Sequence, residues 1–269
     1  MKRPRRPRRK VILLVLVLLI GSAAAGSLMV YAKPVRAILV DYSSMNEIGN
    51  RIYLEAGLQM EDTLASNLLT QAEAAEDQVA EVFGSRVSAP YLIFAITPKT
   101  WNRYAENPTG QTYYYPWRNY IVIGPEGLNE NVISHEFSHA ELRERLHNKK
   151  KVPAWFDEGL ATMIDGRYLH SEAVWKEQTN DGRQPFNMDT LDSYRDFDYG
   201  TPEAYLHYNL ACHEVTRWYS LVGSEGLTRL IDELNNGKKF GPLYREIEGI
   251  RAGSGAQPRS FPASKAPAK

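Results

Sequence analysis

Two short motifs hold the residue types of a metal centre: HEFSH, which begins at His135, and EGLAT, which begins at Glu158. If HEFSH is helical, His135 and His139 lie one turn apart on the same face, so both imidazoles can reach one metal ion. Zinc in a catalytic site takes three protein ligands and keeps a fourth position for water, so two histidines need one more donor. Glu158 is the candidate for that donor, and Glu136 would lie beside the metal without binding it.

The two motifs need two helices that bring them together. Eighteen residues separate His139 from Glu158. In the segment PAWFDEGLA, Pro153 suits the first turn of a helix, and Trp155 and Phe156 can contribute to a buried apolar face. We therefore expect one helix that carries HExxH and a following helix that carries the carboxylate. Glu158 has an alternative role as a first-turn acid that complements a helix dipole, which would leave zinc one ligand short.

The combination of HExxH, an eighteen-residue gap and WFDEGLA resembles the HExxH-x18-E and WLxEGxA pattern of the gluzincins, the aminopeptidase-N-like and peptidase-MA-like zinc peptidases. The resemblance covers roughly residues 120 to 240. It implies an α+β fold of the thermolysin-like zincin type, with a small sheet, the HExxH helix and a helical C-terminal subdomain. It also implies that His135, His139 and Glu158 bind Zn²⁺ and that Glu136 is the general base.

The same resemblance implies a tyrosine on a later helix that stabilises the tetrahedral oxyanion. The segment AYLHYNLACHEVTRWYSLVG is similar to the family helix that carries it, which favours Tyr205 as a catalytic residue, with Tyr208 one turn later as the second choice. Either tyrosine has the alternative role of packing between helices. No GxMEN-like segment precedes HEFSH, and in aminopeptidases this segment binds the free amino terminus of the substrate. The sequence therefore favours an endopeptidase, with an aminopeptidase as the alternative.

The first 32 residues have the composition of a membrane anchor. Residues 1–10 contain seven Lys or Arg and no acid, and residues 11–32 contain no charge. As a helix, these 22 uncharged residues would span about 33 Å, enough to cross the hydrocarbon core of a bilayer. The positive end should stay in the cytoplasm, so this single-pass cell-membrane protein should hold its catalytic domain on the extracytoplasmic side. A cleaved secretory signal, with residues 11–20 as its apolar core, is the alternative and also exports the domain.

Charge and cysteine content narrow the expected partners. Seven of the 32 basic residues and none of the 32 acidic residues lie in residues 1–32, so the rest of the chain has a net charge of −7. That charge argues against a nucleic-acid partner, which requires a basic face. Cys212 is the only cysteine, so an intramolecular disulfide is impossible, and we expect this side chain to be buried. The expected partners are a peptide or protein substrate and, through the N-terminal helix, the membrane.

Hydrophobic periodicity predicts the elements that position the motifs. We expect short strands at residues 37–44 and 51–58, an amphipathic helix at residues 58–83 that stops at Gly84, and strands at Ala89–Thr97 and Thr112–Gly124. The resemblance to gluzincins implies that the strand before the HExxH helix runs along the cleft, where an extended peptide can add as a further strand. Pro116 within Thr112–Gly124 is consistent with such an edge position. Asn129 is a suitable N-cap for the HExxH helix.

Helices and loops are also predicted after the second motif. Residues 165–200 lack sustained periodicity, which predicts loops with one short helix near Ser171–Gln178. The tripeptide TPE at residues 201–203 has the order of a helix start, and a further helix is expected at residues 224–237. Residues 251–269 contain almost nothing that could form a core, so we expect them to be disordered.

The predicted domains are a basic cytoplasmic segment at residues 1–10, a transmembrane signal-anchor at 11–32, a juxtamembrane segment at 33–57, a zinc metallopeptidase domain at 58–250 and the tail at 251–269. The predicted function is a membrane-anchored, extracytoplasmic peptidase in which Glu136 deprotonates a metal-activated water. One alternative is a catalytically inactive, metallopeptidase-like binding or scaffold protein of the cell envelope. Another is an anchored envelope protein whose HExxH arises by chance.

A C-terminal tag tests the predicted topology. Protease added to intact cells or spheroplasts should digest the tag, because the basic residues 1–10 keep the amino terminus in the cytoplasm. A tag that stays protected would contradict export. A mature protein that begins near residue 26 or 33 would replace the anchor with a cleaved signal.

Overall fold

The computed structural model describes residues 32–59, 61–147 and 151–253, and within these ranges the fold is α+β, as predicted. No helix in them is long and apolar enough to cross a bilayer. The predicted transmembrane segment 11–32 lies outside the described residues except for its last position, and so does the predicted tail beyond residue 253.

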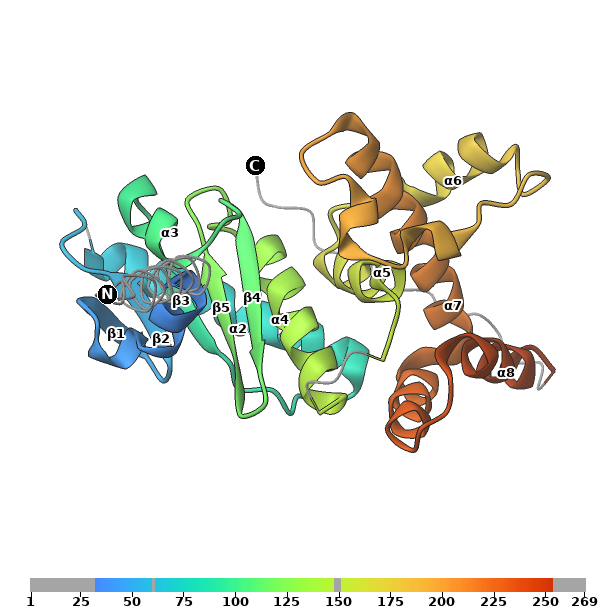
Figure 1. The fold of residues 1–269 in the computed structure, drawn as a ribbon, viewed down its shortest axis with the longest axis horizontal. Helices are drawn as coiled ribbons and strands as arrows, with labels where there is room; N and C mark the ends of the chain where they lie inside the picture. The colour runs from blue at the N-terminus through green and yellow to red at the C-terminus, as the bar shows by residue number, and fades with distance from the viewer. Residues whose placement is uncertain (1–31, 60, 148–150, 254–269) are drawn as a thin grey trace, which may run out of the picture.

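The molecule has two lobes, one built around a sheet and one built from helices (Figure 1). The strands are β1 (Met45–Gly49), β2 (Ile52–Glu55), β3 (Tyr91–Phe94), β4 (Gly110–Tyr115) and β5 (Arg118–Ile123). The helices are α2 (Glu61–Phe83), α3 (Pro98–Tyr104), α4 (Glu130–Arg145), α5 (Ala154–Asp165), α6 (Ser171–Thr179), α7 (Pro202–Asn235) and α8 (Phe240–Gly253), preceded by helical residues 32–38. Helices α5 to α8 make up the second lobe.

The described sheet has five strands in the order β1-β2-β3-β5-β4. The central pairs, β2–β3 and β3–β5, are parallel, whereas the outer pairs, β1–β2 and β4–β5, are antiparallel. Successive side chains point to opposite faces of the sheet, so each face has its own core. Phe94 of β3 packs into the main core with α2 and α4, and Ile93 packs into a smaller core on the other face. Among the described strands, β4 lies at one edge and pairs only with β5.

Two strand predictions were wrong. Residues 112–124 belong to a hairpin, in which Pro116 and Trp117 turn the chain between β4 and β5. Proline has no N–H for strand pairing and therefore suits a turn. The tyrosines on either side of Pro116 and Trp117 belong to two antiparallel strands, which the sequence pattern had joined into one. Residues 37–44 are not a strand either, because they contain the end of a helix and the 3-10 turn Val40–Tyr42. The edge strand itself exists, as β4.

Several helix predictions were confirmed. The helix predicted at residues 58–83 is α2, and Gly84 after it has a φ of 75°, which glycine adopts without strain. Asn129 caps α4, because its side chain accepts a hydrogen bond of 3.0 Å from the backbone amide three residues later. The two helices predicted after Thr201 are continuous in α7 except at Gly223, where a φ of 64° breaks the helical backbone.

Residues 33–57, predicted as a juxtamembrane segment, are built into the sheet. They supply β1 and β2, and the buried side chains of Tyr53 and Leu54 in β2 pack into the cores on opposite faces. The folded unit therefore includes this segment.

The loops between α5 and α7 are packed against the main core. The short helix predicted at Ser171–Gln178 is present as α6, and two 3-10 turns follow, η2 (Met188–Leu191) and η3 (Tyr194–Phe197). Leu191 and Phe197 from these turns are buried in the main core. This long connection is consequently a fixed part of the helical lobe.

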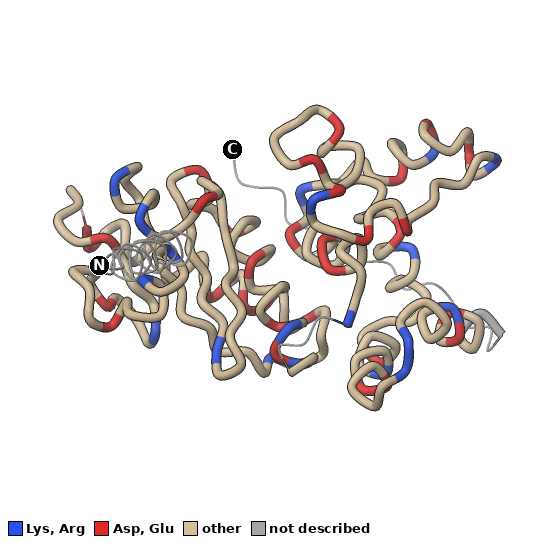
Figure 2. The backbone as a smooth tube through the Cα atoms, viewed as in Figure 1, with Lys and Arg blue, Asp and Glu red and all other residues tan. Residues whose placement is uncertain are grey.

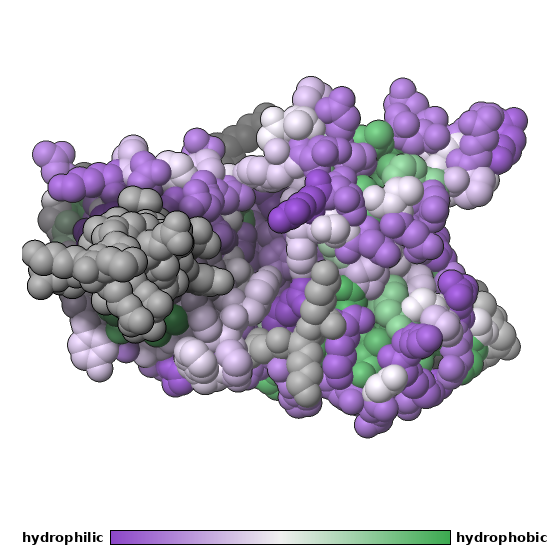
Figure 3. All heavy atoms as spheres, in the orientation of Figure 1, coloured by the Kyte–Doolittle hydropathy of each residue, from purple (hydrophilic) through white to green (hydrophobic). Residues whose placement is uncertain are grey.

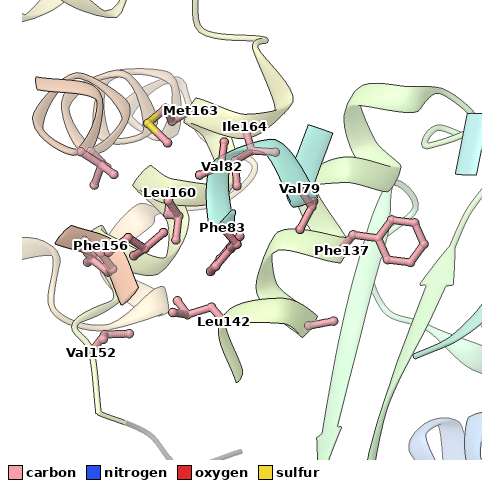
Figure 4. Packing of buried hydrophobic residues seen from close by; sticks show 14 of the residues in the cluster. Val79, Val82, Phe83, Phe137, Leu142, Val152, Phe156, Leu160, Met163 and Ile164 are labelled. Carbon is pink, nitrogen blue, oxygen red and sulfur yellow. The ribbon is translucent and has the colours of Figure 1, made fainter. Parts of the chain in front are cut away.

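The main core joins the two lobes. Val79 and Val82 of α2, Leu142 of α4, and Phe156 and Leu160 of α5 are all buried in it. Figure 4 shows these side chains converging where the three helices meet. Because the HExxH helix and the Glu158 helix share this core, close packing fixes their relative position.

Helix α5 is buried along its whole length, between α2, α4 and α7. A Cβ at Gly159 would lie 2.5 Å from the carbonyl oxygen of Ala211 in α7, so glycine is needed for this close approach. Cys212, next to that contact, is buried, as predicted. The glycine of the EGLAT motif therefore serves the packing of two helices.

The surface differs between the lobes. In Figure 3, hydrophobic residues on this face gather over the helical lobe, around α7 and α8. The same lobe has a cavity of about 570 Å³ between the start of α5 and α8, lined in part by Trp155, Phe240 and Tyr244, and no residue of HEFSH borders it. Figure 2 shows Lys and Arg interspersed with Asp and Glu along both lobes.

Candidate metal centre

The three proposed zinc ligands meet at one point. His135 and His139 extend from α4 and Glu158 extends from α5, and all three side chains are buried. The Nε2 atoms of the two histidines are 3.2 Å apart. Glu158 Oε2 lies 3.4 Å from His135 Nε2 and 3.7 Å from His139 Nε2. Within the described part of the chain, this is the one group of three or more His, Cys, Asp or Glu side chains placed to share an ion.

The spacing of these atoms fits a tetrahedral zinc ion. Ligands about 2.0–2.1 Å from zinc at tetrahedral angles lie about 3.3 Å from one another, close to the three separations in this triangle. Glu158 Oε2 is buried and has no hydrogen-bond partner among the described residues. A buried carboxylate oxygen is unfavourable unless a donor or a cation meets it. The residues present therefore fit a zinc ion held by His135, His139 and Glu158.

Each histidine is oriented by an aspartate that no motif predicted. His135 Nδ1 lies 2.8 Å from Asp165 Oδ2, and His139 Nδ1 lies 2.8 Å from Asp157 Oδ1. When Nδ1–H is donated to a carboxylate, the ring presents the lone pair of Nε2 to the metal position. Both aspartates belong to α5, and Asp165 follows Glu158 by seven residues, or two helical turns. That spacing is a signal from which Asp165 could have been found.

Two arginines and a tyrosine support these aspartates. Asp157 Oδ2 accepts hydrogen bonds from Arg143 and from the hydroxyl of Tyr194. Asp165 Oδ2 accepts hydrogen bonds from Arg167, of 2.7 Å from Nη2 and 2.9 Å from Nε. Burial acts to raise the pKa of Asp157, but the neighbouring histidine and Arg143 outweigh it and hold the pKa below its usual range. The negative charge behind the histidine ring is thereby kept at neutral pH.

The carboxylates raise the pKa values of both histidines in the metal-free protein. Burial favours the neutral imidazole, but Asp157 and Glu158 outweigh it at His139 and raise the pKa to about 9. Burial is likewise outweighed at His135, where the hydrogen bond with Asp165 and the nearby carboxylate of Glu158 raise the pKa. Protons and a metal ion consequently compete for the same nitrogens.

Glu136 lies beside the three proposed ligands and is positioned by β4. Its Oε2 accepts a hydrogen bond of 2.6 Å from Thr112 Oγ1. Its carboxylate also packs against Gly110, where an added Cβ would lie 2.6 Å from Oε1, so only glycine leaves room. The predicted general base thus depends on two residues of the edge strand, and no local pattern in the sequence had indicated either of them.

A cavity of about 100 Å³ borders His135 and Glu136 and includes Tyr208 of α7 in its wall. Tyr205, the first choice as oxyanion donor, does not line this cavity and is 59% exposed. Three residues along a helix shift a side chain by about 4.5 Å and rotate it by about 60°, enough to separate the two tyrosines. The structure therefore places Tyr208, the second choice, at the site.

No protein-family model matches this chain, and a search of curated proteins also gives no match. The function must therefore be inferred from the site itself. Its main features are three buried donor atoms in a triangle, two histidine rings oriented by aspartates, and a glutamate beside them.

Zinc binding should weaken as the pH falls. His139 has a pKa of about 9 in the metal-free protein and the pKa of His135 is also raised, so both rings must release protons to bind, and the apparent zinc affinity should rise by at least about tenfold per pH unit from pH 6.5 to 9. Zinc titrations against a competing chelator at several pH values measure this slope. His213→Gln is the control and should leave this slope unchanged. His213 stacks on Trp175, with ring centroids 4.6 Å apart, and burial lowers its pKa, so it does not release a proton in this pH range. A zinc affinity independent of pH would contradict competition with protons.

Proposed function

We propose that the protein is a zinc-dependent peptidase of the gluzincin type, which hydrolyses peptide bonds with water and a glutamate base. The observation that carries the proposal is the buried triangle of His135 Nε2, His139 Nε2 and Glu158 Oε2, with sides of 3.2, 3.4 and 3.7 Å. Three protein ligands, in place of the four of a structural zinc site, leave a position for water. Glu136 next to this triangle supplies the base that a purely structural site does not need.

Bound zinc would supply a Lewis acid, which lowers the pKa of water and polarises the scissile carbonyl. The carboxylate of Glu136 takes a proton from the attacking water and returns it to the nitrogen of the leaving amine. Thr112 donates to Glu136 Oε2, which fixes the carboxylate and leaves Oε1 to receive the proton. Tyr208, in the wall of the adjoining cavity, would donate a hydrogen bond from its hydroxyl group to the oxyanion that develops at the carbonyl.

Strand β4 supports an endopeptidase. Among the described strands it pairs only with β5, and its residues Gly110 and Thr112 contact Glu136. A peptide that adds to the free edge of β4 by main-chain hydrogen bonds would pass the metal centre in an extended form. Such a strand would recognise the peptide backbone at any position along a substrate. The sequence has no GxMEN-like segment before HEFSH to bind a free amino terminus, so cleavage within peptides is favoured over removal of their first residue.

The proposal includes export of the catalytic domain. Residues 1–32 would either hold it on the outer side of the cell membrane or be removed as a secretory signal. In both cases the substrates are extracytoplasmic peptides or proteins.

Glu136→Gln should remove turnover and leave zinc binding intact, because glutamine cannot accept the proton and the three ligands are unchanged. We expect kcat to fall by about 10²- to 10⁴-fold, the usual contribution of a general base. Cleavage of a peptide library and metal analysis of the same preparation measure the two properties. Glu144→Gln is the matched control, since Glu144 lies on the same helix and accepts a hydrogen bond from Asn119 instead.

Two outcomes of this experiment would reject the proposal. Wild-type turnover in Glu136→Gln would reject the general base. A wild-type protein that binds zinc and cleaves no peptide would favour the binding or scaffold protein.

Tyr208→Phe should lower kcat by roughly one to three orders of magnitude with little change in KM, because one donor to the oxyanion is lost. Tyr205→Phe is the matched control and should keep the wild-type kcat, since Tyr205 is exposed and outside the cavity. Steady-state kinetics with an amino-terminally blocked peptide compare the two variants. If Tyr205→Phe alone loses activity, the oxyanion donor is Tyr205.

A further inference from the structure

The cavity beside Glu136 has a cationic group that the proposed reaction does not use. Among the described residues, Arg167 is the only Lys or Arg in its wall, and Glu136 is the only Asp or Glu there. Neutral polar side chains, among them Asn107, Tyr199 and Tyr208, line much of the remainder. A positive charge thus faces the space next to the reacting bond.

One edge of Arg167 is fixed on Asp165. The Nε and Nη2 atoms of Arg167 lie 2.9 and 2.7 Å from Asp165 Oδ2, and its backbone N–H donates to Asp165 Oδ1 at 2.8 Å. Gly166 between them ends α5 with a left-handed φ of 66°, which turns the chain back toward the centre. Nη1 makes no hydrogen bond to the described residues, so this part of the guanidinium can bind a ligand.

The cavity is small, and a hydrogen bond joins two of the residues in its wall. Tyr199 donates a hydrogen bond of 3.0 Å to Asn107 Oδ1, which links the loop before α7 to the loop before β4. A space of about 100 Å³ suits a small polar group. The planar donors of arginine and the hydroxyl groups of tyrosine match the two oxygens of a carboxylate.

We propose that Arg167 binds a carboxylate of the substrate in this cavity, so that the enzyme prefers peptides with a carboxylate next to the scissile bond. The inference rests on the proposed peptidase function and adds a substrate class to it. Glu136 in the same wall would repel such a group, and Arg167 offsets that repulsion with charge-assisted hydrogen bonds. The carboxylate comes either from an Asp or Glu side chain or from the carboxyl terminus of a peptide.

Two pairs of peptides separate these sources. One pair is blocked at both ends and has either Glu or Gln beside the cleaved bond, and the other has either a free or an amidated carboxyl terminus. The zinc-loaded full-length protein should favour the carboxylate in one pair by about tenfold to a hundredfold in kcat/KM, mostly through KM. The pair with the preference identifies the source. Equal rates within both pairs would overturn the proposal.

Variants assign the preference to Arg167. Arg167→Gln should remove it, whereas Arg183→Gln should keep it, because Arg183 binds Asn180 and does not line the cavity. Arg167 also contacts Asp165, so the zinc content of each variant is measured. Arg167→Lys keeps a charge beside Asp165 without the planar fork, and it should retain zinc and lose most of the preference. A preference unchanged in Arg167→Gln would overturn the proposal.

Binding measurements distinguish failure of this inference from failure of the peptidase function. Calorimetric titration of the same peptides into metal-free protein removes zinc as a partner of their carboxylates, and comparison of wild type with Arg167→Gln separates the contribution of Arg167 from that of His135, which lines the same cavity. Suppose that no peptide is cleaved, and that the carboxylate peptide binds about tenfold more tightly than its partner to wild type but not to Arg167→Gln. The carboxylate site would then be supported and the peptidase function rejected. Equal binding within both pairs rejects the carboxylate site, whatever the turnover.

Discussion

The structure depends on two imidazoles and a carboxylate oxygen buried within 3.7 Å of one another. Such a group is unfavourable unless each polar atom meets a partner. Asp165 and Asp157 bind the outer nitrogens of the two histidines, and Arg167 and Arg143 in turn bind the aspartates. The atoms that point inward have each other as close neighbours, and Glu158 Oε2 has no hydrogen-bond partner among the described residues. A cation placed between them would satisfy all three.

Two elements impose this arrangement on the chain. Helix α5 carries Asp157, Glu158 and Asp165 and is buried throughout. The two aspartates can be buried because each one contacts a histidine and an arginine. Gly159 allows α7 to approach closely. Strand β4 holds Glu136 through Thr112 and Gly110 while its own outer edge lacks a strand partner among the described residues. Helix packing therefore sets the positions of His135, His139 and Glu158, and the sheet sets the position of Glu136.

The sequence by itself determined the local parts of the site and of the fold. His135 and His139 lie on one face of a helix because 3.6 residues make a turn, and that rule needs no tertiary information. Asn129 caps α4 and Gly223 divides α7 for equally local reasons, which are a side-chain hydrogen bond to a nearby amide and the freedom of glycine at positive φ. The amphipathic period of α2 likewise indicated a helix with one buried face.

Only the tertiary structure decided which groups surround those residues. Asp157 meets His139 because α4 and α5 cross in the shared core, and Thr112 meets Glu136 because β4 runs beside α4. Tyr208 lines the cavity and Tyr205 does not because of the rotation of α7 about its axis where it packs on α5. Contacts of this kind join segments far apart in the chain, and helical or strand periodicity contains no information about them. They arise when separate elements pack at fixed angles, so they follow from the three-dimensional arrangement and not from any local pattern.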